Sequence, residues 1–146
     1  MALTTASAVI SLARQLETDS AAFYEALARR FPQGGETFQA FARENTKKNV
    51  VQVERAYYSV ISDAIEGCFA FKMNEEDWVL DTSLSGDATF ADGVAQAAAQ
   101  ERKIRDFYTT AAEQSQGLMA DVPRAFLAVA KKHAARLEKI ESLPGA

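Results

Sequence analysis

Apolar residues recur along four stretches of this chain at helical spacing. Between Ile10 and Phe31 they return every three or four residues, and the same period appears in three later stretches. Such spacing gathers apolar side chains on one face of an α-helix. The pattern predicts an all-α protein with helices over residues 5–31, 36–66, 90–116 and 121–142, in a single domain spanning 1–146.

Residues that favour turns separate the predicted helices. Proline and glycine follow the first helix, and Gly67 is the expected end of the second. Thr89 or Asp87 is expected to cap the third helix, and Asp121 the fourth. Short links join the first helix to the second and the third to the fourth, so each pair is predicted to form an antiparallel hairpin.

The link between the two hairpins is longer and covers about residues 68–88. A helix of 25 residues is about 38 Å long, and about a dozen extended residues span that distance. The link is therefore long enough to cross the whole bundle and let the second and third helices run parallel. Its apolar residues are expected to pack onto the bundle, with a dimer contact as the alternative: Phe69, Phe71, Trp78, Val79 and Leu80.

A local pattern occurs twice, once in the first predicted helix and once in the third. Glu17 precedes Tyr24 by seven residues, and Glu101 precedes Tyr108 by the same interval. Seven residues make two helical turns, so each glutamate lies on the same helix face as its tyrosine. The repeat predicts a duplicated helix pair in which each half directs one carboxylate inward.

Charge and composition exclude several classes of partner. The net charge is -4, from 16 basic and 20 acidic side chains, and the sequence has no basic stripe, so nucleic acid is not an expected partner. No apolar run reaches the roughly 20 residues of a membrane span, and no secretion signal is evident. The lone Cys68 cannot form an internal disulfide, which favours a cytoplasmic location.

These motifs make the chain similar to a known family. It resembles the rubrerythrin-like branch of the ferritin-like superfamily through four phrases: Leu16-Glu17 with Phe23-Tyr24, Gln100-Glu101 with Phe107-Tyr108, Phe38-x-x-Phe41-Ala42 and Phe126-x-x-Val129-Ala130. The resemblance implies a ferritin-like four-helix bundle of two antiparallel hairpins joined by one long crossover. It also implies a family whose members bind two irons and act in oxidation, peroxide reduction or iron storage. By the same analogy the chain is expected to form a homodimer.

The ligand pattern of that family is incomplete here. The resemblance implies a Glu-x-x-His on the second and fourth helices, where this chain has Asn45 with Lys48, and His133 with Arg136. A register beginning at Glu44 is the alternative on the second helix, but a helical wheel turns that residue away from the apolar face. No register restores a full Glu-x-x-His on either helix. Of six expected ligands Glu17 and Glu101 remain, His133 stands in an unusual place and three are lost, so the resemblance predicts a degenerate di-iron site.

One hypothesis is that a cluster of charges has replaced the metal centre. Lys48 and Arg136 would neutralise Glu17 and Glu101, because buried charges require partners. Lys48 lies at the margin of its helix's apolar face, with Asn49 nearer the centre. If Lys48 faces solvent, the buried charges no longer balance. The glutamates would then require trapped water, or one of them would have to be protonated.

The rival hypothesis is a mononuclear metal site. Glu17, Glu101 and His133 could together hold one Fe, Mn or Zn ion. His133 lies near the middle of the apolar face of its helix, where an inward ring is either a ligand or a hydrogen-bonded core residue. Tyr24 and Tyr108 are candidates to bond the carboxylates or to supply a radical; the alternative is that both are ordinary core tyrosines.

The sequence thus predicts a rubrerythrin-like protein whose di-iron centre has been lost or reduced. The first hypothesis is a non-ferroxidase bundle with a salt-bridged core. In such a bundle the former metal site stabilises the fold, or binds an unknown protein partner or a small ligand. The alternative is a mononuclear metal-binding protein with residual oxidoreductase or peroxide-related activity. The expected cofactor is accordingly either none or a single metal ion, and no residue is assigned a catalytic role.

Overall fold

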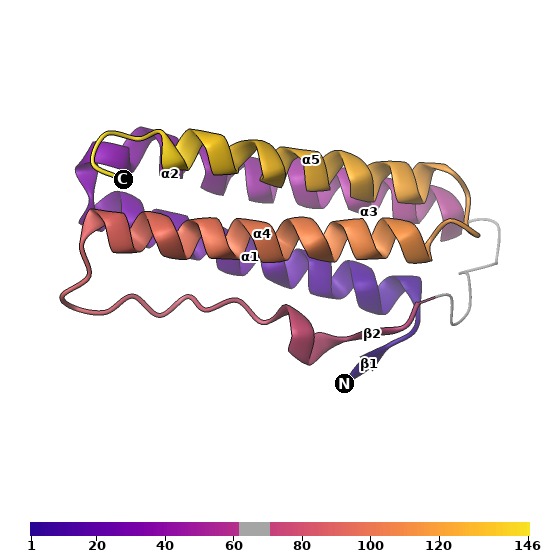
Figure 1. The fold of residues 1–146 in the computed structure, drawn as a ribbon. Coiled ribbons are helices and arrows are strands. Elements are labelled where there is room, and N and C mark those ends of the chain that lie inside the picture. Colours follow the sequence, from indigo (N-terminus) through magenta and orange to yellow (C-terminus); the bar gives the residue numbers. More distant parts are fainter. Residues whose placement is uncertain (62–70) are drawn as a thin grey trace.

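The computed structural model describes residues 1–61 and 71–146 as a bundle of long helices (Figure 1). The predicted helical bundle is confirmed, and the described helix ends lie close to those expected. The predicted end of the second helix, at Glu66 and Gly67, lies outside the described residues, as do Cys68 and Phe69. The α-helices are α1 (Ala6–Arg30), α2 (Gly35–Glu44), α3 (Val50–Ile61), α4 (Phe90–Gln114) and α5 (Asp121–Glu141).

The helices lie side by side in two antiparallel pairs (Figure 1). The short 3-10 turn η1 (Pro32–Gly34) reverses the chain between α1 and α2, and α5 returns along α4. In this view α3 and α4 run in the same direction, and the chain before α4 follows the long axis of the bundle back to its far end. This arrangement brings residues distant in sequence to the same level of the bundle.

The second long helix contains a widened turn. Between α2 and α3 the backbone forms the π-helical segment η2 (Asn45–Asn49) and continues without a break. A π turn holds an additional residue, so side chains after it are rotated relative to an uninterrupted α-helix, and such turns are frequent at functional sites. The segment lies level with the middle of α1.

A short strand ladder and an apolar anchor hold the crossing segment. β1 (Ala2–Leu3) pairs antiparallel with β2 (Met73–Asn74), which the sequence pattern did not predict. Phe71 and Leu80 are buried, and Trp78, at the end of the 3-10 turn η3 (Glu75–Trp78), packs edge-on against Phe107 at 5.7 Å. Val79, expected to pack with them, is instead 62% exposed.

Both helices begin where predicted, at Phe90 and Asp121, but the predicted cap is correct only for α4. Thr89 caps α4 in a capping box: its Oγ1 accepts from the Asp92 N–H at 3.2 Å, and Asp92 Oδ2 accepts from the Thr89 N–H at 2.9 Å. Asp121 was expected to cap α5 but is its first residue, with Ala120 at the N-cap position. Its charge still suits the positive end of the helix dipole.

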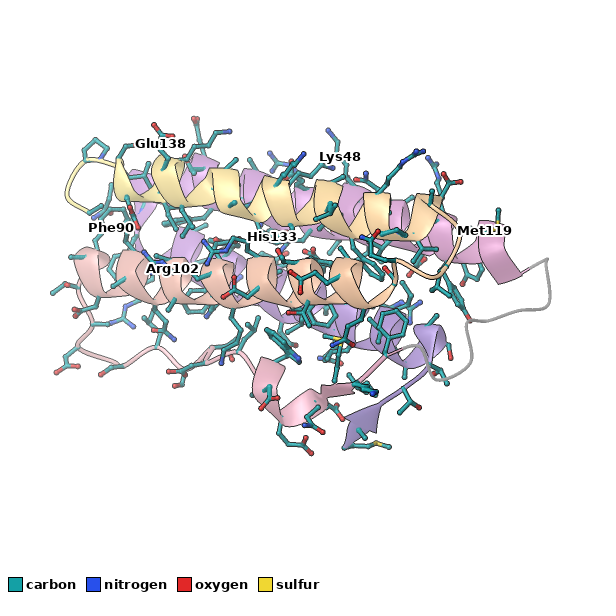
Figure 2. All side chains as sticks on the ribbon, turned by 45° about the vertical axis from the view of Figure 1, so that its right-hand side comes forward. Lys48, Phe90, Arg102, Met119, His133 and Glu138 are labelled. Carbon is teal, nitrogen blue, oxygen red and sulfur yellow. The ribbon has the colours of Figure 1, made fainter. Side chains whose placement is uncertain are left out.

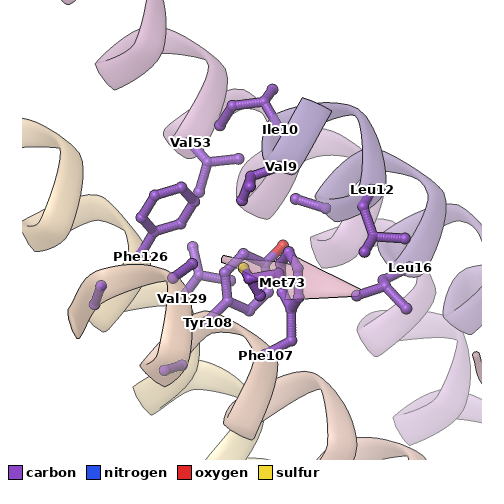
Figure 3. Packing of buried hydrophobic residues seen from close by; sticks show 14 of the residues in the cluster. Val9, Ile10, Leu12, Leu16, Val53, Met73, Phe107, Tyr108, Phe126 and Val129 are labelled. Atoms are coloured by element: carbon purple, nitrogen blue, oxygen red, sulfur yellow. The ribbon is translucent and has the colours of Figure 1, made fainter. Parts of the chain in front are cut away.

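The described core forms two apolar clusters, one toward each end of the bundle. The cluster in Figure 3 includes Leu16, Val53, Phe107, Phe126 and Val129. The other cluster gathers aromatic and small side chains nearer the α1–α2 turn: Phe23, Tyr24, Leu27, Phe38, Phe41, Phe90 and Ala97 among them. Between them along each long helix lie buried polar residues, so the fold places a polar layer at mid-height. Within the described residues no helix is both long and apolar enough to cross a membrane.

Candidate functional site

The polar layer contains the residues that the sequence singled out. Its buried polar residues lie on α1, η2, α4 and α5, where one apolar cluster gives way to the other, and His133 lies near the middle of the bundle (Figure 2). Glu17, Glu101 and His133 have no exposed surface, and Arg136 is 2% exposed. The completely buried amides of the π segment are Asn45 and Asn49. Charged groups this deeply buried must be compensated by partners.

His133 bridges the two duplicated glutamates. Its Nε2 lies 2.7 Å from Glu17 Oε1, and its Nδ1 lies 2.6 Å from Glu101 Oε2. A neutral imidazole has one N–H and one lone pair, whereas carboxylates only accept, so the bridge requires both ring nitrogens to be protonated. Burial opposes that charge, but the carboxylates of Glu17 and Glu101 outweigh it and raise the pKa of His133 to about 9.

Glu101 is the most heavily bonded carboxylate of the layer. Besides His133, it accepts from the Tyr24 hydroxyl at 2.6 Å and from Arg136 Nη1 at 3.2 Å, both on Oε1. Burial alone would raise its pKa, but His133 and Arg136, with the Tyr24 hydrogen bond, lower the pKa of Glu101 below its ordinary value. Glu101 is therefore held as a carboxylate between two cations.

The duplicated tyrosines bond across the bundle. Tyr24 on α1 donates to Glu101 on α4, and Tyr108 on α4 donates to Glu17 on α1 at 2.9 Å. Burial and the neighbouring carboxylates raise the pKa of both Tyr24 and Tyr108 well above the ordinary phenol value, so both are neutral donors. The Tyr108 ring also stacks on His133 at 5.9 Å. Tyr24 and Tyr108 therefore hydrogen-bond the carboxylates, which is one of the roles predicted for them.

Arg136 connects the layer to the protein surface. Its Nη2 donates to Glu44 Oε1 at 2.7 Å and to the Phe41 carbonyl at 3.3 Å, and its guanidinium lies 4.7 Å from the centre of the Phe41 ring. The Glu44 side chain is 33% exposed, whereas that of Arg136 is 2% exposed. Burial disfavours the charged guanidinium, but Glu101 raises the pKa of Arg136 further. Arg136 therefore carries a permanent positive charge inside the bundle.

The buried charges of the described layer balance. Glu17 and Glu101 contribute two negative charges, and His133 and Arg136 contribute two positive ones. Glu44 adds a third carboxylate at the edge, where water reaches it. As in the charge-cluster hypothesis, two buried carboxylates are paired with two buried cations. One of the cations is different, because His133 takes the place expected for Lys48.

Lys48 lies outside the cluster, contrary to the expectation. It is exposed and sits at the outer surface of the bundle (Figure 2), whereas Asn49 is buried. Asn49 Nδ2 lies 3.4 Å from Asn45 Oδ1 and 3.5 Å from His133 Nε2, and Asn45 Nδ2 donates to the Glu17 carbonyl at 3.2 Å. The physical reason is the position of Lys48 at the margin of the apolar face, where Asn49 is nearer the centre; in the π segment Asn45 and Asn49 are the buried residues.

The donor set does not fit a di-iron centre. Two irons require about four carboxylates and two imidazoles, whereas the layer offers two buried carboxylates, one imidazole, two amides and a guanidinium. Among the described residues, no group of three or more His, Cys, Asp or Glu side chains is arranged to hold a metal ion. Both nitrogens of His133 already face carboxylates at hydrogen-bond distance. Any ion would have to displace at least one of those contacts.

Comparisons with known proteins identify no relative. No protein-family model, no curated protein and no solved structure matches this chain. The resemblance to the rubrerythrin-like branch thus rests on the residues and motifs themselves.

Sequence reasoning missed the parts played by Glu44 and Asn49. A helical wheel turns Glu44 from the apolar face, yet the long Arg136 side chain reaches it from α5. Asn49 was noted as nearer the face centre than Lys48, but the Glu-x-x-His count favoured Lys48. The available signal was the helical wheel, which puts Asn49 and not Lys48 nearer the centre of the apolar face.

Replacing Tyr24 with Phe should lower the free energy of unfolding by about 1–3 kcal/mol, because a buried carboxylate loses a donor. Urea denaturation monitored by circular dichroism measures this. Tyr58→Phe is the matched control, since the Tyr58 side chain is 56% exposed and its change should stay within about 0.5 kcal/mol. Equal effects of the two substitutions would show that the Tyr24–Glu101 bond does not stabilise the fold.

Proposed function

We propose that this protein is a non-ferroxidase helical bundle in which a charge cluster stands where a metal centre would be expected. The observation that carries the proposal is the bridge of His133 between Glu17 and Glu101, at 2.7 and 2.6 Å. An imidazolium in that position, together with Arg136, neutralises the two carboxylates that would otherwise attract a cation. The cluster then serves the fold, and binding functions lie on the surface.

The family assignment forms part of the proposal. The parallel course of α3 and α4 and the long crossing segment support a ferritin-like bundle (Figure 1). The symmetric placement of Glu17 with Tyr108, and of Glu101 with Tyr24, supports descent from a duplicated hairpin. A π turn opposite these carboxylates supports an origin as a functional site. On this proposal the chain is a rubrerythrin-like protein whose di-iron ligands have been exchanged for ion pairs.

A mononuclear metal protein is the second candidate. It is favoured by Glu17 Oε2, which is buried and has no hydrogen-bond partner among the described residues. Glu17, Glu101 and His133 would be the ligands of one Fe, Mn or Zn ion, which would supply any residual oxidoreductase activity. Binding would require His133 to give up a proton, because a ring nitrogen coordinates through its lone pair.

Elemental analysis distinguishes the two candidates. Protein purified without a His-tag should contain almost no metal, both as isolated and after incubation with Fe(II), Mn(II) or Zn(II) followed by desalting. Its melting temperature should be the same with and without a chelator, because no bound ion stabilises the native state.

Two other metal contents would contradict the charge-cluster proposal. About one equivalent of metal, lost in His133→Gln but kept in the exposed-site control Lys48→Gln, would establish the mononuclear protein. About two equivalents would contradict both candidates and the ligand assignment behind them.

A further inference from the structure

A groove of about 800 Å³ runs along the outer surface between the η2–α3 segment and α5. Five of its eleven lining side chains are basic, and the lining residues come from two parts of the sequence more than sixty residues apart. The lining cations are Lys47, Lys48, Arg55, Arg124 and Lys132, and the lining anion is Asp121. The sequence shows no basic stripe because the stripe exists only when these two helices pack together.

The groove is strongly positive on a negative protein. Its lining carries five positive charges and one negative, a net charge of +4, whereas the chain as a whole has -4, so the remainder carries -8. In the described part of the chain none of the five cations forms an ion pair, although Lys132 Nζ donates to Gln52 Oε1 at 3.2 Å. A hollow lined mainly by charges of one sign concentrates the electrostatic field and attracts ligands of the opposite charge.

The bottom of the groove is apolar. Small residues from both helices form it, and the largest of them is Val51. Ala125 is buried, and Ala56 and Ala128 are half-buried. Because these side chains are short, α3 and α5 leave a hollow between them that can receive a flat or aliphatic group.

The cations stand at two levels of the groove. Along α5, Arg124 and Lys132 are eight residues apart, which is about 12 Å at 1.5 Å per residue. Lys132 meets the η2–α3 helix at Gln52, one turn from Lys48. Arg55 lies about 10 Å further along the same helix from Lys48. A ligand must therefore match a concave, cationic, partly apolar site of small-molecule size.

We propose that this groove binds a small organic polyphosphate of nucleotide size. Its phosphates would pair with the lysine and arginine side chains, and its organic part would lie over the alanine floor. Arginine and lysine are the side chains best suited to phosphate oxygens. The groove is separate from the buried polar layer, so this proposal does not depend on whether the protein binds a metal.

Isothermal titration calorimetry on the full chain tests the proposal, with inorganic triphosphate and ATP as probes in low salt without divalent cations. Both should bind saturably at about one equivalent, more weakly as salt rises. ATP should bind more tightly than triphosphate because of the floor, and adenosine alone should not bind. Equal affinity for ATP and triphosphate would overturn the proposal that the alanine floor contacts the organic part of the ligand.

Two matched double variants separate the groove from general charge. Arg55→Gln with Arg124→Gln should weaken ATP binding by about tenfold per guanidinium removed, since each loses charged hydrogen bonds. Arg43→Gln with Lys131→Gln removes the same charge from exposed positions outside the groove and should change the affinity less than about twofold. Equal weakening by both pairs, or no saturable binding to the wild type, would overturn the proposal.

Backbone amide shifts of the wild-type protein give a second readout that needs no variant. Shifts induced by ATP should concentrate on η2, α3 and α5, and shifts confined to other helices would contradict the assignment. A single-stranded 20-mer oligonucleotide should bind no more tightly than ATP. Much tighter binding of the oligonucleotide would replace the small-molecule assignment with a nucleic-acid one.

Discussion

Replacing Glu101 with Gln should lower the free energy of unfolding by about 3–5 kcal/mol, which is the usual cost of breaking a buried ion pair by removing one partner. The amide keeps the shape of the side chain but removes its charge. Arg136 then keeps only the partly exposed Glu44 as an ionic partner, and His133 keeps only Glu17. Urea denaturation of the variant and the wild type measures the difference.

Two comparisons sharpen that experiment. Glu141→Gln breaks an exposed pair with Arg102, at 3.0 Å with both side chains 51% exposed, and should cost less than about 1 kcal/mol. Glu17→Gln should fall between the two, because Glu17 pairs with His133 but not with Arg136 among the described contacts. A cost below about half a kcal/mol for Glu101→Gln would show that the cluster does not hold the bundle together.

The stability of the protein should fall as the pH rises from about 6.5 to above 9. The pKa of His133 is about 9 in the folded protein and 6.5 as a free side chain. A pKa raised by folding contributes stability that is complete below the unfolded value and is lost above the folded one. The shift corresponds to about 3 kcal/mol. Because the pKa of Glu101 is lowered, its own contribution is instead lost on the acid side.

The single histidine allows a direct measurement. The chain contains one His, so its ring resonances can be followed by NMR without ambiguity. The titration midpoint should lie near pH 9, and urea denaturation across the same range should show the matching loss of stability. A midpoint at or below about 6.5 would mean that the ring is neutral at pH 7 and that the bridge is not ionic.

The helices and the two carboxylates could be predicted from the sequence because they follow from local rules. The period of apolar residues located the bundle, and the repeated Glu-to-Tyr interval located Glu17 and Glu101. The inward ring of His133 followed from its place on the apolar face. These inferences require only that an α-helix continue with its ordinary period.

The remaining features depend on departures from that period or on packing between distant segments. The π turn is not visible in the apolar period, and within it Asn45 and Asn49 are buried while Lys48 is exposed. The pair of Arg136 with Glu44 depends on how far a long side chain reaches from another helix. The β1–β2 ladder pairs only two residues of each strand, too few for an alternating pattern to be visible. The basic groove joins two surfaces that appear unrelated in the sequence.

The crossed tyrosine bonds have a consequence for how the two halves of the chain recognise each other. A pair of N-terminal hairpins would bury two copies of Glu17 without His133 or Arg136. A pair of C-terminal hairpins would bury two histidines and two arginines against two copies of Glu101. The buried layer has no net charge only when one N-terminal hairpin combines with one C-terminal hairpin. The halves therefore behave as complementary fragments, and an exchange of hairpins between molecules must preserve one of each.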